Sequence, residues 1–148
     1  MKIFYAFVLL FAIFKLIDAY EEYRRVCLNN EVDVGIRKTP WENFATHTCI
    51  SGPLTRTCVI VDARNGFTCT GERHLQGGLP YQKSLCCDRK FHRLVLCRIS
   101  QLFSFRDGFN IQLGTKVIKS VIPNPIPSDQ TAFRVEICNL LQTRYGAY

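Results

Sequence analysis

The sequence lacks the residue patterns that mark the common classes of enzyme and nucleic-acid-binding protein. No Ser/His/Asp order and no pair of carboxylates has a spacing typical of a catalytic site, and the chain holds only three histidines. It has no basic-aromatic motif of the kind that recognises nucleic acid. No Asn-x-Ser/Thr acceptor is present, so we expect no N-linked glycan. Glycine and proline are not in excess and no repeat is visible, which favours a folded domain over a disordered chain.

Only one long apolar run is present, and it lies at the beginning of the chain. Residues 3–14 are all apolar, Lys2 precedes them, and the sequence turns polar from Tyr20. This layout predicts a secretory signal peptide over residues 1–19, with cleavage after Ala19. A membrane-spanning helix needs roughly 20 apolar residues, so we expect no integral membrane span. Residues 20–148 then form a single disulfide-stapled, extracellular domain that is long enough to bury a modest core.

All eight cysteines fall within this predicted domain. An even number of cysteines behind a signal peptide predicts four disulfides, because the secretory pathway oxidises thiols. The sequence does not choose among the many possible connectivities, but the last cysteine is expected to tie the C-terminal segment to the body. The cysteines are Cys27, Cys49, Cys58, Cys69, Cys86, Cys87, Cys97 and Cys138.

Short β-rich runs separated by turn signals follow one another along the chain. Apolar residues alternate with others over residues 32–36, which is typical of a strand. The runs Thr55–Asp62 and Phe67–Thr70 flank the dipeptide Asn65-Gly66, and this arrangement predicts a β-hairpin. A second hairpin is expected around Asp107-Gly108.

The C-terminal part of the chain carries two overlapping patterns, after a further expected strand at residues 115–122. Apolar residues alternate as in a strand at Phe133, Val135 and Ile137. They also recur on one face of a helix at Phe133, Ile137, Leu140 and Leu141. Ser128 as an N-cap and Gly146 as a stop favour the helix. We therefore predict an α+β fold, a small disulfide-rich domain dominated by β-hairpins with a C-terminal helix.

One stretch, "SLCCDRKFHRLVLCR" at residues 84–98, raises the question of catalysis. Its cysteine pair, histidine and later cysteine follow a Gly-Gly loop and a proline, an order that resembles secretory calcium-dependent phospholipases. The resemblance implies a hydrolase in which His92 is the general base. Four residues separate Cys87 from His92 where the family has two, which turns the histidine by roughly 200° around a helix. Arg93 stands where the family has a calcium-binding aspartate, and a cation repels the metal. We therefore expect no catalytic residue and keep a divergent phospholipase-like hydrolase as an alternative.

The same stretch contains ligand types that zinc accepts, at Cys87, His92 and Cys97. Because all the cysteines are expected to be oxidised, we predict no metal site and no cofactor. Adjacent residues of a strand point to opposite sides, so Cys86 and Cys87 can each bond a different neighbour. The pair is therefore interpreted as a crosslinking node.

A concentration of positive charge lies in the same stretch, in a chain whose formal net charge is +7. We name this set the basic strip and predict that it binds a partner. Arginine suits sulfate, phosphate and carboxylate groups because its planar fork can bind them bidentately. Asp88 interrupts the charge, and a simple solvated face is the competing interpretation. The basic strip consists of Arg89, Lys90, His92, Arg93 and Arg98.

Two further features of the sequence are candidate recognition elements. Trp41, the single tryptophan, is expected to be buried or half-buried in the core rather than to anchor a partner. The segment Gly71–Pro80 is expected to be a long flexible loop that exposes Arg73 and His74. A loop of this kind also suits a constrained-loop protease inhibitor, although no residue marks a scissile bond.

Together these patterns predict a secreted, cysteine-rich, non-enzymatic binding protein. Its loops and the basic strip would meet an extracellular protein or a sulfated or acidic surface, and not nucleic acid. The disulfides would hold the loops in place, so that little conformational entropy is lost on binding. The hydrolase and the protease inhibitor remain the alternatives.

Overall fold

The computed structural model describes residues 5–10, 25–79 and 83–143. Residues 5–10 form a short helix, and the rest of the described chain is built from eleven strands joined by turns and loops. The strands are β1 (Glu31–Lys38), β2 (Thr46–Ser51), β3 (Thr55–Asp62), β4 (Phe67–Thr68), β5 (His74–Leu79), β6 (Lys83–Arg89), β7 (His92–Ile99), β8 (Phe103–Ser104), β9 (Phe109–Gln112), β10 (Lys116–Pro123) and β11 (Ala132–Gln142).

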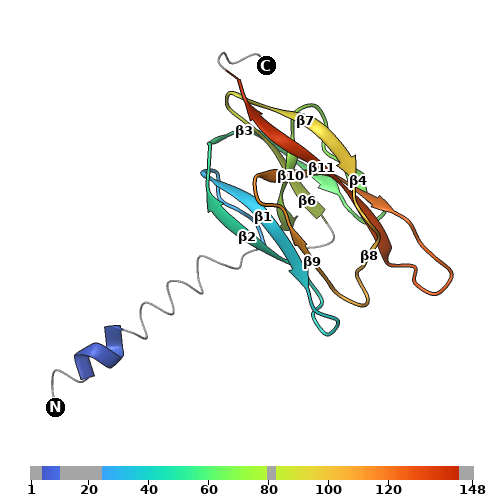
Figure 1. Ribbon diagram of the computed structural model, residues 1–148, viewed down its shortest axis with the longest axis horizontal. Coiled ribbons are helices and arrows are strands. Elements are labelled where there is room, and N and C mark those ends of the chain that lie inside the picture. The colour runs from blue at the N-terminus through green and yellow to red at the C-terminus, as the bar shows by residue number, and fades with distance from the viewer. Residues whose placement is uncertain (1–4, 11–24, 80–82, 144–148) are drawn as a thin grey trace.

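The described strands form three antiparallel sheets. The first has the order β2-β1-β9 and the second has the order β3-β6-β5. The third has the order β4-β10-β11-β7, and the short β8 also pairs with β11. Figure 1 shows β1, β2 and β9 side by side, with β10 and β11 above and to the right of them.

Each sheet contributes to a single hydrophobic core. β1 and β9 supply Ile36 and Ile111, β5 supplies Leu75, and β10 and β11 supply Ile118 and Val135. All five side chains are less than a tenth exposed. Because no sheet buries its apolar face alone, the three sheets are expected to be stable only together.

The predicted C-terminal helix is wrong, and with it the α+β class, since the described domain is mostly β-sheet. Residues 132–142 form β11, the longest strand, which pairs with β10 on one side and β7 on the other. The alternating pattern is the one that matches the structure. Val135 belongs to the core, and Phe133 and Ile137 pack against it. Pairing along both edges satisfies the backbone groups of β11 and decides between two patterns that the segment alone left open.

The two predicted hairpins are also wrong in their pairing, although their turns and strands are present. β3 has the predicted bounds, but it pairs with β6, while β4 pairs with β10 in another sheet. Likewise β8 pairs with β11 and β9 pairs with β1. Each turn therefore passes the chain from one sheet to another instead of joining neighbours.

The turn at Gly66 allows a close approach between β4 and β10. Gly66 has a φ of +83°, and a Cβ atom there would lie 2.4 Å from Cδ of Pro123 and 2.5 Å from the carbonyl oxygen of Val121. We expect Gly66→Ala to lower the free energy of unfolding by about 2–4 kcal/mol, since a left-handed backbone and a steric overlap both oppose it. Chemical denaturation measures the change.

Gly71→Ala is the matched control for this substitution. Gly71 also has a positive φ, +61°, but no atom lies within 4 Å of the position its Cβ would take. Its replacement should cost only about 1 kcal/mol, the price of the left-handed backbone alone. Equal losses at both glycines would contradict the close approach.

Four disulfides join all eight cysteines, as predicted. They are Cys27–Cys49, Cys58–Cys87, Cys69–Cys86 and Cys97–Cys138. The adjacent Cys86 and Cys87 bond two different segments, which confirms the crosslinking node. The bond from Cys138 to Cys97 ties β11 to β7 and confirms that the last cysteine anchors the C-terminal segment.

The N-terminal segment is described only at residues 5–10. The predicted cleavage site after Ala19 lies outside the described residues. No helix among the described residues is both long and apolar enough to cross a membrane. The disulfides are consistent with an extracellular protein.

Candidate functional site

An apolar cavity of about 500 Å³ lies among the three sheets and is the candidate functional site. Its inner end is formed by core side chains, among them Leu75, Ile118 and Val135. Its outer end is formed by exposed residues of the loops that connect the strands, such as Phe44 and Arg64, so the cavity opens to solvent. A cavity of this size, apolar and partly open to solvent, has the properties of a small-molecule site.

Phenylalanines line much of the cavity. Phe109 of β9 packs edge-on against Phe133 of β11, with ring centroids 5.2 Å apart, and Phe105 lies 6.1 Å from Phe109. Phe67 of β4 and Phe44 of the loop after β1 add further rings. These residues come from distant parts of the sequence and meet only through the pairing of the strands.

A polar pair, Asp33 and His47, lies beside the apolar lining. The Asp33 carboxylate accepts hydrogen bonds from Nδ1 of His47 and from the backbone N–H of Gly35. Nε2 of His47 accepts a hydrogen bond from the backbone N–H of Gly78, with a distance of 3.3 Å between the two nitrogens. Both ring nitrogens of His47 are therefore engaged in hydrogen bonds within the domain. His47 and Ser84 both line the cavity.

Cations lie around the mouth of the cavity. The Arg25 guanidinium lies over the Phe44 ring, 3.9 Å from its centroid, and the Lys38 ammonium lies 4.7 Å from the centroid of Phe105. Both rings line the cavity. Arg64 lines it as well, but its guanidinium pairs with Asp62 at 2.7 Å. No acidic residue is among the described residues that line the cavity.

The first member of the basic strip, Arg89, is not at the surface. It is fully buried and donates to Oε1 of Gln76, to Nε2 of His74 at 3.3 Å and to the Pro53 carbonyl oxygen at 2.8 Å. The network continues from Gln76, whose Nε2 donates to the carbonyl oxygen of Cys27 at 3.0 Å. The network fixes β5, β6 and the segment before β1 to one another.

Burial sets the protonation of this network. Desolvation, together with the charge of Arg89, lowers the pKa of His74 to about 4. Desolvation also lowers the pKa of Arg89 to about 10, so the guanidinium stays charged at neutral pH. The uncharged imidazole can therefore accept a hydrogen bond from its cationic neighbour.

The predicted loop Gly71–Pro80 is largely the strand β5, and its description as an exposed loop is wrong. His74 and Gln76 are fully buried because Arg89 of the neighbouring strand supplies hydrogen bonds to their polar groups. Arg73 is half-buried and donates to the hydroxyl oxygen of Thr57. His74 and Gln76 of this segment therefore belong to the interior of the domain.

The remaining members of the basic strip lie on the turn before β7 and on β7 itself. Arg93 pairs with Leu141 and Arg98 with Ile137, four residues apart in β11, so both arginines lie on one face of the sheet, roughly 13 Å apart. The two arginines are five residues apart in β7. One extra residue in this strand, at Leu96 with a φ of +53°, places both of them on the same face.

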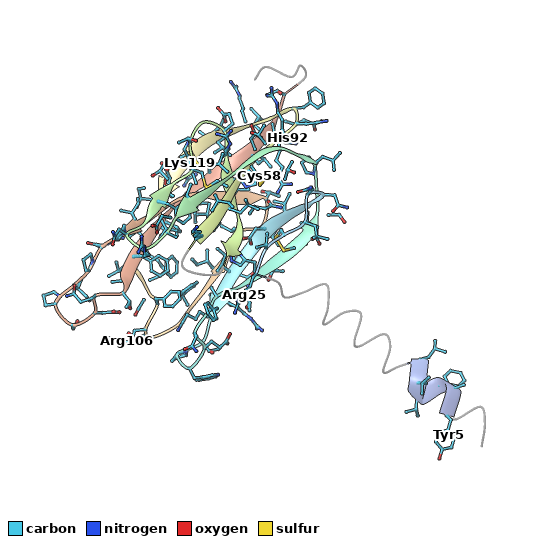
Figure 2. The ribbon with its side chains drawn as sticks, turned by 180° about the vertical axis from the view of Figure 1, so that it is seen from behind. Tyr5, Arg25, Cys58, His92, Arg106 and Lys119 are labelled. Carbon is cyan, nitrogen blue, oxygen red and sulfur yellow. A yellow bond between two sulfur atoms is a disulfide. The ribbon has the colours of Figure 1, made fainter. Side chains whose placement is uncertain are left out.

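Lys90 is exposed in the turn, and His92 lies on the opposite face, with Nδ1 2.7 Å from the Lys90 carbonyl oxygen. Arg106 and His92 lie at opposite ends of the domain (Figure 2). Anion binding by the exposed members, Lys90, Arg93 and Arg98, stays a prediction.

The cysteine-histidine stretch forms β6, a two-residue turn and β7, where the phospholipase resemblance implies a helix. Cys87 and Cys97 are both in disulfides, so neither offers a thiolate to a metal beside His92. No group of three His, Cys, Asp or Glu side chains within residues 5–10, 25–79 and 83–143 is arranged to hold a metal ion.

Trp41 is not in the core, contrary to the prediction. It is 81% exposed in the loop between β1 and β2, the loop that also carries Phe44. Pro40 precedes it and ends the strand pairing, so the loop extends beyond the sheet.

Sequence reasoning did not find the cavity. The only signal for it was the number of phenylalanines, 11 in the chain, and no local spacing relates those that line the cavity.

No family model, curated protein or solved structure matches the chain. The function of the protein is therefore argued from its own side chains.

Proposed function

We propose that this chain is a secreted, non-enzymatic binding protein that carries a hydrophobic small molecule in the cavity among its sheets. The observation that carries the proposal is the cavity itself, about 500 Å³ in volume and lined mainly by aliphatic and phenylalanine side chains. A carrier needs no catalytic residue. The polar pair beside the cavity lining, Asp33 and His47, forms hydrogen bonds within the domain, which agrees with a structural role for this pair.

The disulfides support a carrier in a specific way. Cys69 follows β4 directly and is bonded to Cys86 of β6, so the bridge holds the wall that contains Phe67. A wall fixed before the ligand arrives loses little conformational entropy on binding. An open apolar cavity in a domain of this size would otherwise tend to collapse, because filling empty space is favourable.

An uncharged fluorescent probe tests this proposal. We expect 1-N-phenylnaphthylamine, which brightens in apolar surroundings, to bind the oxidised protein at micromolar concentration with one site per chain. Ala63 lines the cavity at the turn after β3, and Ala63→Trp should fill part of the space. The probe should then bind at least about fivefold more weakly.

The control variant adds the same side chain elsewhere. Ile60 is 61% exposed on β3 and does not line the cavity, so Ile60→Trp should leave probe affinity unchanged. Probe binding that is absent in the wild-type protein, or equal in both variants, would show that the cavity is not a binding site.

A further inference from the structure

Lys38 is a buried cation without an anionic partner. The side chain is only 5% exposed, and its ammonium donates one hydrogen bond, to the Thr39 carbonyl oxygen at 3.0 Å. None of the ion pairs formed within the described residues includes Lys38. An ammonium has three donors, and a buried charge normally requires a counter-ion. The ammonium also lies 4.7 Å from the centroid of the Phe105 ring, and that ring lines the cavity.

Arg25 supplies a second positive charge at the same mouth. Its guanidinium stacks on Phe44, and its carbonyl oxygen accepts the N–H of Gly78, which fixes the backbone of Arg25 beside β5. The same Gly78 N–H also lies 3.3 Å from His47 at the start of β2. Figure 2 shows Arg25 beside the sheet that contains β1 and β2.

The two cations belong to the same end of that sheet. Lys38 is the last residue of β1 and pairs with Phe109, the first residue of β9. Phe44 lies in the loop that leads from β1 to β2. An anion held at this end would therefore approach both charges while its apolar part entered the cavity.

The acidic residues near the mouth do not neutralise these cations. Asp62 pairs with Arg64, Asp107 pairs with Arg106, and Asp129 lies 3.9 Å from Arg106. Glu42 accepts a hydrogen bond from the Thr39 hydroxyl and forms no ion pair with Lys38 or Arg25 among the described residues. The positive charge of Lys38 and Arg25 is thus left for a ligand.

From this geometry, and resting on the proposed function, we infer that the cavity takes a single-chain amphiphile with an anionic head group. The hydrocarbon chain would lie among the phenylalanines. A carboxylate or phosphate would lie at the mouth, between the Arg25 guanidinium and the end of β1 that carries Lys38. A guanidinium can bind either head group bidentately. The ammonium behind Phe105 would lower the energy of the bound anion through a region of low dielectric.

Displacement of the uncharged probe separates this inference from the proposed function. We expect dodecanoate to displace the probe at about tenfold lower concentration than dodecanol, because only the acid can use the charge-assisted contacts. Dodecyl phosphate, tested in parallel, shows whether a phosphate head group is preferred over a carboxylate.

Two variants place the charge preference on named residues. Arg25→Gln and Lys38→Met should each reduce the preference for the acid several-fold, while the affinity for the uncharged probe stays within about twofold of the wild type. The preserved probe affinity shows that the variants are folded. Arg93→Gln removes an exposed cation of β7 and serves as the matched control, with no change expected.

The outcomes are distinguishable. Binding of the probe without any preference for an anionic head group would overturn this inference and leave the proposed function standing. A preference for the acid that both variants retain would overturn the assignment to Arg25 and Lys38. Failure of the probe to bind would overturn the proposed function itself.

Discussion

Replacing Arg89 with alanine is expected to lower the free energy of unfolding by about 3–5 kcal/mol, the largest loss for any single substitution considered for this chain. The guanidinium is fully buried and donates to the side chains of Gln76 and His74 and to two backbone carbonyl oxygens, those of Asn29 and Pro53. Alanine leaves these acceptors buried without donors and leaves a void where the side chain was. Equilibrium denaturation of the oxidised protein by urea measures the loss.

Arg93→Ala is the matched control, since it removes the same side chain from an exposed position of β7. Its effect should stay within about 0.5 kcal/mol, as for most surface substitutions. Arg89→Lys should recover only a small part of the stability, because a lysine cannot reproduce the fork of donors. A loss below about 1 kcal/mol for Arg89→Ala would show that the network does not hold the three segments together.

Removal of the Cys69–Cys86 disulfide is expected to affect both stability and binding. In the double variant Cys69→Ala/Cys86→Ala, loss of the crosslink should lower the free energy of unfolding by about 2–5 kcal/mol. Both cysteines are fully buried, so the truncation also removes packing. Because the bridge holds the segment after Phe67, the uncharged probe should bind more weakly even under conditions where the variant is folded.

The Cys97–Cys138 bridge provides the comparison, since it joins β7 to β11 and neither cysteine lines the cavity. The variant Cys97→Ala/Cys138→Ala should lose a similar amount of stability but should keep its probe affinity. If both double variants lose probe affinity equally, the effect comes from general loosening of the domain and not from the cavity wall.

Local pattern was enough to predict several strands but not their partners. The alternating segment at residues 32–36 and the run Thr55–Asp62 both became strands, because alternation of apolar residues directly reflects a half-buried strand. A turn signal such as Asn65-Gly66 only states that the chain reverses. Whether the next strand pairs with the previous one depends on contacts between distant segments, which a single sequence does not display.

Tertiary contacts also explain why β5 was mistaken for a loop. Its sequence, HLQGGL, contains two glycines and two polar residues and has no apolar period. His74 and Gln76 are tolerated inside the domain only because a buried arginine, Arg89, satisfies them. That arginine was predicted to be at the surface, so the two errors have one cause. The cavity, built from single residues of many strands, had no local signal to find.

The alternation of β6 links the pattern of disulfide bonds to the position of a charge. Cys87 and Arg89 share one face of the strand, while Cys86 and the cavity-lining Ser84 share the other. Exchanging the partners of the two adjacent thiols would require β6 to slip by one residue, and a one-residue slip exchanges the faces. Arg89 would then lie on the side of the cavity. Each disulfide isomer therefore corresponds to one strand register. Stepwise reduction and alkylation, followed by sequencing across Cys86 and Cys87, reports the register of β6 in any refolded preparation.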